Sequence, residues 1–238
     1  MNRLSRAVWP ALALIALLAG PAARAEDATP IPCTEDAMIV FDASGSMAGN
    51  TVQGLFSDIT RIDEVRKALA QVLPNAAKFR KIGLITFGPG PYEQCNVKLN
   101  LEPMPNATEP IMSAVNAINP AGKTPLVQAV KLAAEILEHR SEKGVVVLLT
   151  DGEETCGGAP CDLGKLLKST SRQLTVHVIG YQLKAFRWTG AQSFLDAKCL
   201  AEETGGLYIS AENRQDLIDA FEKTLGCPMM SSIGGASR

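Results

Sequence analysis

Short apolar runs alternate with amphipathic stretches along most of the sequence, and this alternation limits the possible folds more than any other feature. The clearest apolar run is Val-Val-Val-Leu-Leu at residues 145–149, which predicts a central strand buried on both faces. The clearest amphipathic stretch is residues 126–137, where Leu126, Val130 and Leu137 share one helix face. Repeated strand–helix alternation predicts an α/β fold, in which helical crossovers join parallel strands into an open, doubly wound sheet with helices on both faces.

The same two patterns place the other elements. Further strands are predicted at residues 37–41, 81–87, 97–101, 174–179 and 207–209. Further helices are predicted at residues 61–73, 111–118, 163–167, 194–203 and 216–225. Polar and apolar residues alternate in the stretch 97–101, which is typical of a half-exposed strand at the edge of a sheet.

The first 25 residues have the pattern of a secretory signal peptide. Arg3 and Arg6 precede an apolar run at residues 11–19, and Ala-Arg-Ala at residues 23–25 has the small residues that a signal peptidase reads. The apolar run is shorter than a membrane span, and Pro10 and Pro21 flank it. We therefore expect cleavage after residue 25, a mature chain without a membrane span, and a periplasmic or secreted location; an uncleaved anchor is the alternative.

The remaining chain is long enough for one domain with its own core. We expect a linker at residues 26–35, the domain at 36–226 and a C-terminal tail at 227–238. The formal net charge of the whole chain is −2, and the sequence has no basic cluster. This charge pattern argues against nucleic acid and anionic membranes as partners.

The sequence contains six cysteines, an even number that predicts disulfides in an exported chain. We expect three pairs, in decreasing order of support: Cys33–Cys227, Cys156–Cys161 and Cys95–Cys199. The first pair lies at the two edges of the patterned region, and the termini of a domain are often close together. The second pair flanks a tight turn, and the third pair is what remains. A zinc site is the alternative, but paired C-x-x-C motifs are missing.

Oxygen-bearing side chains occur where an open α/β sheet binds its ligands, beyond the carboxyl ends of the strands. Asp42, Ser44 and Ser46 follow the first predicted strand, with alternate spacing that allows all three side chains to face one centre. Asp151 follows the central strand, and Thr124 precedes the strongest helix. If the two strands are neighbours in the sheet, these five side chains converge.

Hydroxyl and carboxylate oxygens are the ligands that hard cations prefer, and Mg²⁺ usually keeps some of its waters. Only two of the five side chains are anionic, so a bound cation would remain electrophilic and would attract an outside anion. The simpler interpretations are a plain turn at Asp151 and a helix N-cap at Thr124, with Pro125 at the first helical position.

Three segments resemble the parts of the metal-ion-dependent adhesion site of von Willebrand factor A domains, in the order that this family has. They are Asp-Ala-Ser-Gly-Ser-Met at 42–47, Gly-Lys-Thr-Pro at 122–125 and Thr-Asp-Gly-Glu-Glu at 150–154. The resemblance covers residues 36–226 and is closest to bacterial exported members, which have features similar to residues 154–158 and 201–206. One departure is the long segment at residues 48–60, beside the expected site.

The resemblance implies a mostly parallel six-stranded sheet with one antiparallel edge strand. It also implies that Ser44, Ser46 and Thr124 contact the metal, while Asp42 and Asp151 act mainly through water. The expected ion is Mg²⁺, with Ca²⁺ and Mn²⁺ as alternatives. An Asp or Glu carboxylate of a partner protein would fill the remaining position, which makes the chain a binding module and not an enzyme.

The main alternative is a metal-dependent phosphohydrolase with Asp42 as its nucleophile. Phosphatases of the haloacid dehalogenase type need a second aspartate two residues later, and Ser44 occupies that place. A phosphate-binding loop is also disfavoured, because Ala117 stands where that motif needs glycine. A structural domain with no metal is the third interpretation.

Overall fold

The computed structural model describes residues 35–51, 59–91, 94–183 and 192–226, with only the backbone described at 192–196. By its internal contacts the chain divides into Met1–Pro30 and Ile31–Arg238, and all described residues belong to the second unit. The predicted signal peptide, most of the linker, the tail and the expected Cys33–Cys227 pair lie outside the described residues.

A six-stranded sheet in the order β3-β2-β1-β4-β5-β6 forms the middle layer. The strands are β1 (Asp36–Asp42), β2 (Ile82–Phe87), β3 (Val97–Met104), β4 (Lys143–Thr150), β5 (Gln173–Tyr181) and β6 (Tyr208–Ala211). β3 pairs antiparallel with β2 and is the half-exposed edge strand, whereas the other neighbouring strands pair in parallel. The predicted fold class is therefore confirmed.

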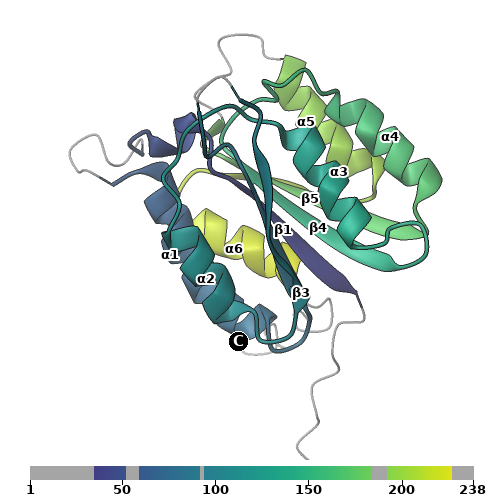
Figure 1. Cartoon of the computed structure of the whole chain (residues 1–238), viewed down its shortest axis with the longest axis horizontal. Helices are drawn as coiled ribbons and strands as arrows, with labels where there is room; N and C mark the ends of the chain where they lie inside the picture. The colour runs from purple at the N-terminus through teal and green to yellow at the C-terminus, as the bar shows by residue number, and fades with distance from the viewer. Residues whose placement is uncertain (1–34, 52–58, 92–93, 184–191, 227–238) are drawn as a thin grey trace, which may run out of the picture. The chain divides into compact units, whose positions relative to one another are not determined.

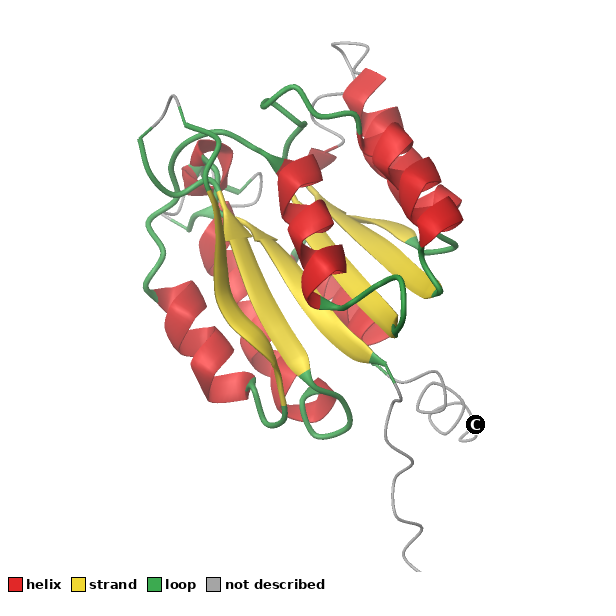
Figure 2. Cartoon of the chain, turned by 45° about the vertical axis from the view of Figure 1, so that its right-hand side comes forward, coloured by secondary structure: helices red, strands yellow, loops and turns green. Residues whose placement is uncertain are grey.

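Helices cover both faces of the sheet (Figures 1 and 2). They are α1 (Arg61–Ala76), α2 (Thr108–Asn116), α3 (Leu126–Ile136), α4 (Pro160–Thr170), α5 (Gln192–Glu203) and α6 (Arg214–Leu225). Figure 1 shows α1, α2 and α6 on one face and α3, α4 and α5 on the other. No helix in the described ranges combines the length and apolarity that crossing a membrane requires.

Two apolar clusters, one on each side of the sheet, hold these layers together. Successive side chains of a strand point to opposite faces, so β1 contributes Ile39 and Phe41 to the cluster under α1 and α6 and Val40 to the cluster under α3. β1 and β4 are buried on both faces, which explains why their sequences are continuous apolar runs and not alternating ones.

A capping box fixes the beginning of α1. The Thr60 hydroxyl oxygen accepts a hydrogen bond from the Asp63 N–H (3.4 Å), and an Asp63 carboxylate oxygen accepts one from the Thr60 N–H (3.3 Å). The first helical residue is therefore Arg61, and its side chain lies near the carboxyl end of β1.

Two disulfides differ from the pairs expected from the sequence. Cys95 pairs with Cys156 (Cα–Cα 6.0 Å), and Cys161 pairs with Cys199 (Cα–Cα 5.0 Å). The expected pairs Cys156–Cys161 and Cys95–Cys199 are thus wrong. Cys161 belongs to the first turn of α4 and faces α5, because α4 packs closely on α5 around Gly164. Cys156 lies in the preceding loop, beside the loop that joins β2 to β3.

We predict that the double substitution Cys161→Ser/Cys199→Ser lowers the free energy of unfolding by about 2–4 kcal/mol, because the unfolded chain loses a loop-closing constraint. Urea denaturation of the variant and the parent protein measures this loss. Mass spectrometry of a non-reduced digest should join Cys95 to Cys156 in both proteins. A digest of the parent that joins Cys156 to Cys161 would contradict the observed connectivity.

Candidate functional site

The pairing of β1 with β4 brings the predicted site residues together. The two strands run in parallel with Phe41 opposite Leu149, so their carboxyl ends lie side by side. Asp42 is the last residue of β1, and Asp151 directly follows β4. The condition stated from the sequence, that the two strands are neighbours, is met. The strand order also reverses between these strands, which is where open α/β sheets place their ligand sites.

Asp42 joins the ends of the two strands. Its side chain is 0% exposed, and each carboxylate oxygen accepts one hydrogen bond. Oδ1 accepts from the Ser44 N–H (2.8 Å), and Oδ2 accepts from the Thr150 hydroxyl (2.7 Å). The first bond curls the chain after β1, and the second ties this curl to β4. Thr150 begins the segment 150–154 that the resemblance includes, but no role was predicted for its side chain.

A chain of short contacts links the serine hydroxyls to Asp151. The Ser44 and Ser46 hydroxyl oxygens lie 3.0 Å apart, and the Ser46 hydroxyl donates to Asp151 Oδ1 (2.6 Å). Ser44 is buried, whereas Ser46 is exposed in the short 3-10 helix Gly45–Ala48. The group is therefore buried on the side of Asp42 and opens to solvent on the side of Ser46.

Thr124 lies next to this group. A methyl group added to Gly152 would lie 3.7 Å from the Ser46 hydroxyl oxygen and 4.0 Å from the Thr124 hydroxyl oxygen, so both hydroxyls border the same small space. The Thr124 N–H donates to the Thr155 hydroxyl (2.8 Å), and the Thr155 N–H donates to the Thr124 carbonyl (3.1 Å). The structure thus gathers all five predicted side chains.

The simpler interpretation of Thr124 as a helix N-cap is wrong. α3 begins at Leu126 after Pro125, without a side-chain cap from the residue that precedes the helix. Glu154 instead accepts a hydrogen bond from the Val127 N–H (2.8 Å) in the first turn of α3 and another from the Cys156 N–H (2.7 Å). A carboxylate at this helix N-terminus is favourable, because the helix dipole is positive there. The contact spans distant segments, which no local pattern predicts.

Two glycines allow the loops of the site to touch through their backbones. Gly88 has φ 106° and Gly122 has φ 76°, a region that favours glycine. A side chain on Gly88 would collide with the backbone of Ser44, and one on Gly122 would collide with the Gly88 carbonyl. Because the Gly45 N–H also donates to the Gly122 carbonyl (3.1 Å), the segment that carries Ser44 and Ser46 is fixed against its neighbours.

Arg61 also reaches the site, and sequence reasoning missed it. Its Nη1 donates to Asp151 Oδ2 (2.9 Å) and to the Ser46 carbonyl (3.3 Å), and its Nε donates to Gln182 Oε1 (3.3 Å). Gln182 lies directly after β5. The available signal was that an arginine is unfavourable in the first turn of a helix, so its position needs another cause.

The two carboxylates share a poorly solvated environment. Burial and then the charge of Asp151 raise the pKa of Asp42 to about 7. Burial also raises the pKa of Asp151, against the opposing effects of the Ser46 hydroxyl and the Arg61 guanidinium. A cation placed between these carboxylates would lower the pKa of both, because it stabilises their charged forms.

The donor set suits a hard cation, with three hydroxyl and two carboxylate side chains. In the described parts of the chain, no group of three or more His, Cys, Asp or Glu side chains is arranged to hold a metal ion. Ligation at this site would therefore depend on Ser44, Ser46 and Thr124, and not on a cluster of acidic or soft ligands.

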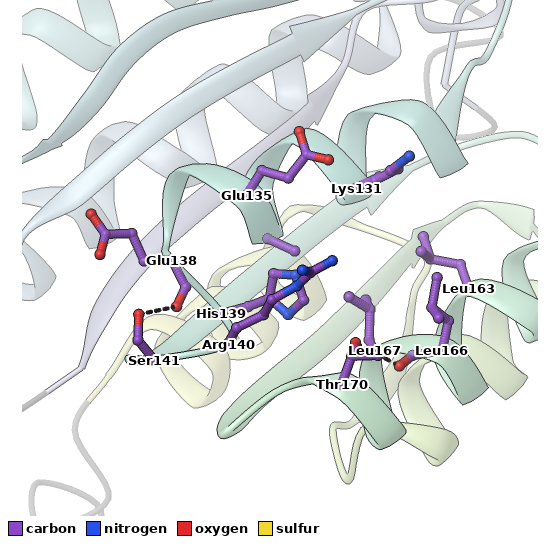
Figure 3. A pocket seen from close by; sticks show the side chains of 11 residues that line it. Lys131, Glu135, Glu138, His139, Arg140, Ser141, Leu163, Leu166, Leu167 and Thr170 are labelled. Carbon is purple, nitrogen blue, oxygen red and sulfur yellow. Dashed lines mark hydrogen bonds between the residues drawn. The ribbon is translucent and has the colours of Figure 1, made fainter.

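A groove of about 300 Å³ lies apart from these residues, between α3 and α4 (Figure 3). His139, Leu163 and Leu167 line it, and the His139 Nδ1 lies 2.8 Å from the Ser171 hydroxyl oxygen. None of the five predicted site residues lines this groove.

Comparisons with known proteins point to one domain family. Residues 37–154 match the von Willebrand factor type A domain. The uncharacterized Bacillus subtilis proteins YwmC and YwmD are 29% and 30% identical over 215 and 199 residues. These alignments cover 86% of this chain and 89% of YwmC, and 78% of this chain and 82% of YwmD.

Two solved structures illustrate the similarity of the fold. The vWF domain of the type V pili tip protein Mfa5 from Porphyromonas gingivalis has a TM-score of 0.60 at 14% identity, covering 89% of this chain and 98% of that one. Proximal thread matrix protein 1 from the mussel byssus, with a zinc-occupied MIDAS motif, has a TM-score of 0.56 at 18% identity, covering 82% and 46%. Sequence and fold agree: this chain belongs to the von Willebrand factor type A domain family.

Proposed function

We propose that this chain is an exported protein-binding module that holds a divalent cation at its site and captures a carboxylate of a partner protein. The observation that carries the proposal is the convergence of Asp42, Ser44, Ser46 and Asp151 in one hydrogen-bonded group, with the Thr124 hydroxyl beside it. The module is assigned to residues 36–226, since the ordered elements run from Asp36 to Leu225.

The positions of the donors support a cation that faces the solvent. Ser44, Ser46 and Thr124 would provide neutral oxygens, and Asp42 and Asp151 would provide charge directly or through water. Mg²⁺ is the expected ion, with Ca²⁺ and Mn²⁺ as alternatives; the mussel protein with zinc in its MIDAS motif adds Zn²⁺ to the ions worth testing. Such an ion supplies an electrophilic position for an outside anion.

The geometry gives little support to a phosphohydrolase. A nucleophilic Asp42 would need an accessible oxygen, but its side chain is fully buried and both oxygens accept hydrogen bonds. The place of the second aspartate is occupied by Ser44, whose N–H serves to orient Asp42. A role in binding needs from Asp42 only its negative charge, which can act on a cation without a free carboxylate oxygen.

Two observations support export. The disulfides Cys95–Cys156 and Cys161–Cys199 are typical of an oxidising compartment, because cytosolic thiols are kept reduced. The signal-peptide pattern at residues 1–25 agrees with this location. We therefore assign the module to the periplasm or the exterior of the cell.

We predict that Asp42→Asn weakens binding of Mg²⁺ and Mn²⁺ at least about tenfold, because one of two negative charges at the site is lost while the shape of the side chain is kept. Isothermal titration calorimetry of the chelator-treated protein measures this change. Asp219→Asn is the matched control, since Asp219 is exposed on α6, and it should bind both ions as the parent protein does. Equal affinities for all three proteins would argue against a cation at this site.

We further predict that the partner protein is captured only with the cation in place. Immobilised parent protein should retain the partner from envelope proteins of its own organism in Mg²⁺ and release it in EDTA. Ser46→Ala should retain much less, because it removes a ligand oxygen at the open side of the site. Retention of the same partner in EDTA, or by Ser46→Ala at the parent's level, would contradict capture through a cation.

A further inference from the structure

Arg61 occupies an unfavourable position in its own helix. It is the first residue of α1, where the helix dipole is positive and favours acidic side chains. The neighbouring Asp63 and Glu64 follow that preference, and Arg61 does not. An interaction outside α1 therefore stabilises Arg61, and the partner is Asp151.

The Arg61 guanidinium is held on three sides. Nη1 lies 2.9 Å from Asp151 Oδ2 and 3.3 Å from the Ser46 carbonyl, and Nε lies 3.3 Å from Gln182 Oε1. The Arg61 side chain is 15% exposed, whereas that of Asp151 is 0% exposed. A bond between a guanidinium and so buried a carboxylate is screened much less than a surface ion pair.

Gln182 is itself fixed. It is buried and has φ 54°, a conformation that non-glycine residues adopt at a cost. Its Nε2 donates to the Glu212 carbonyl (3.3 Å) and to the Tyr181 hydroxyl oxygen (3.4 Å), so its Oε1 is aimed at Arg61. Three segments, after β1, β4 and β5, thus position one guanidinium beside the candidate cation site.

The net charge of the candidate site depends on Arg61. Asp42 and Asp151 bring two negative charges, which a divalent cation would cancel. Arg61 adds one positive charge and is paired with Asp151. The summed charge of these three side chains and a divalent cation is therefore positive with Arg61 and zero without it.

We infer that Arg61 tunes this centre for anionic ligands, weakening the binding of the cation while strengthening the capture of a carboxylate. The inference rests on the proposed function and deepens it. Two positive charges close together repel, so Arg61 reduces the affinity for the divalent ion. The same guanidinium lies at the mouth of the site, beside Ser46, where its charge attracts an acidic side chain and not a neutral amide. The partner class is a protein that presents an exposed Asp or Glu.

The two effects have opposite signs, which makes Arg61→Gln a sharp test. Calorimetry should show Mg²⁺ and Mn²⁺ binding about tenfold more tightly to the variant than to the parent protein. NMR titration of the Mg²⁺-loaded proteins with N-acetyl-Gly-Glu-Gly-amide should show the peptide binding at least about fivefold more weakly to the variant. The glutamine peptide, N-acetyl-Gly-Gln-Gly-amide, should bind both proteins equally weakly.

Thermal unfolding gives a readout that involves no peptide. In EDTA the variant should unfold at a lower temperature than the parent protein, because Asp151 loses its buried counter-charge. Saturating Mg²⁺ should then raise the unfolding temperature of the variant by more than that of the parent, because tighter binding stabilises more.

Two further variants separate charge from structure. Lys67→Gln removes the same charge from an exposed side chain further along α1, and it should change neither affinity. Arg61→Lys keeps the charge, so its Mg²⁺ affinity should stay within about threefold of the parent, even if Arg61→Gln folds poorly.

The outcomes distinguish the two proposals. Parent protein that binds no divalent ion overturns the proposed function and this inference together. Parent protein that binds Mg²⁺ and the glutamate peptide, with both affinities unchanged in Arg61→Gln, overturns the inference alone. A variant in which both affinities fall has lost a structural residue, which also overturns it.

Discussion

The hydrogen bond between the Thr150 hydroxyl and Asp42 is the contact on which the rest of the site depends. It joins the carboxyl ends of β1 and β4, two strands whose residues are 108 positions apart in the chain at this bond. Because both strands are buried on both faces, their relative position is set by the core and not by the loops. A carboxylate can remain fully buried there only because both of its oxygens accept hydrogen bonds.

The loops that carry the hydroxyls are held to this fixed base at close range. Gly88 and Gly122 permit backbone contacts that any side chain would prevent, so Ser44 and Ser46 follow the position of β1. On the other side, Glu154 links the start of α3 to the loop after β4. The Cys95–Cys156 disulfide joins that loop to the segment between β2 and β3. The loops around the site are thus held together by a disulfide and by hydrogen bonds.

The sequence predicted those features that follow from local periodicity and from the ends of strands. Burial on both faces makes β4 a continuous apolar run, and Asp42 and Asp151 are found simply because they follow such runs. The disulfide pairing could not be predicted, because the direction in which Cys161 points depends on how α4 rotates against α5. The position of Arg61 in the first turn of its helix signals a partner elsewhere, but not which one, since its contact with Gln182 joins residues 121 positions apart.

The two carboxylates differ in the groups that offset their negative charges, so the two sides of the site differ in electrostatic potential. Asp42 is surrounded by neutral donors, so its buried charge is offset by dipoles alone, and its pKa is raised to about 7. Asp151 has a full positive charge against one oxygen and a hydroxyl against the other. A cation held by the hydroxyls would therefore stabilise the charged form of Asp42. The positive potential of Arg61 acts on the side of the site away from Asp42, near the exposed Ser46, where an acidic side chain of a partner would arrive.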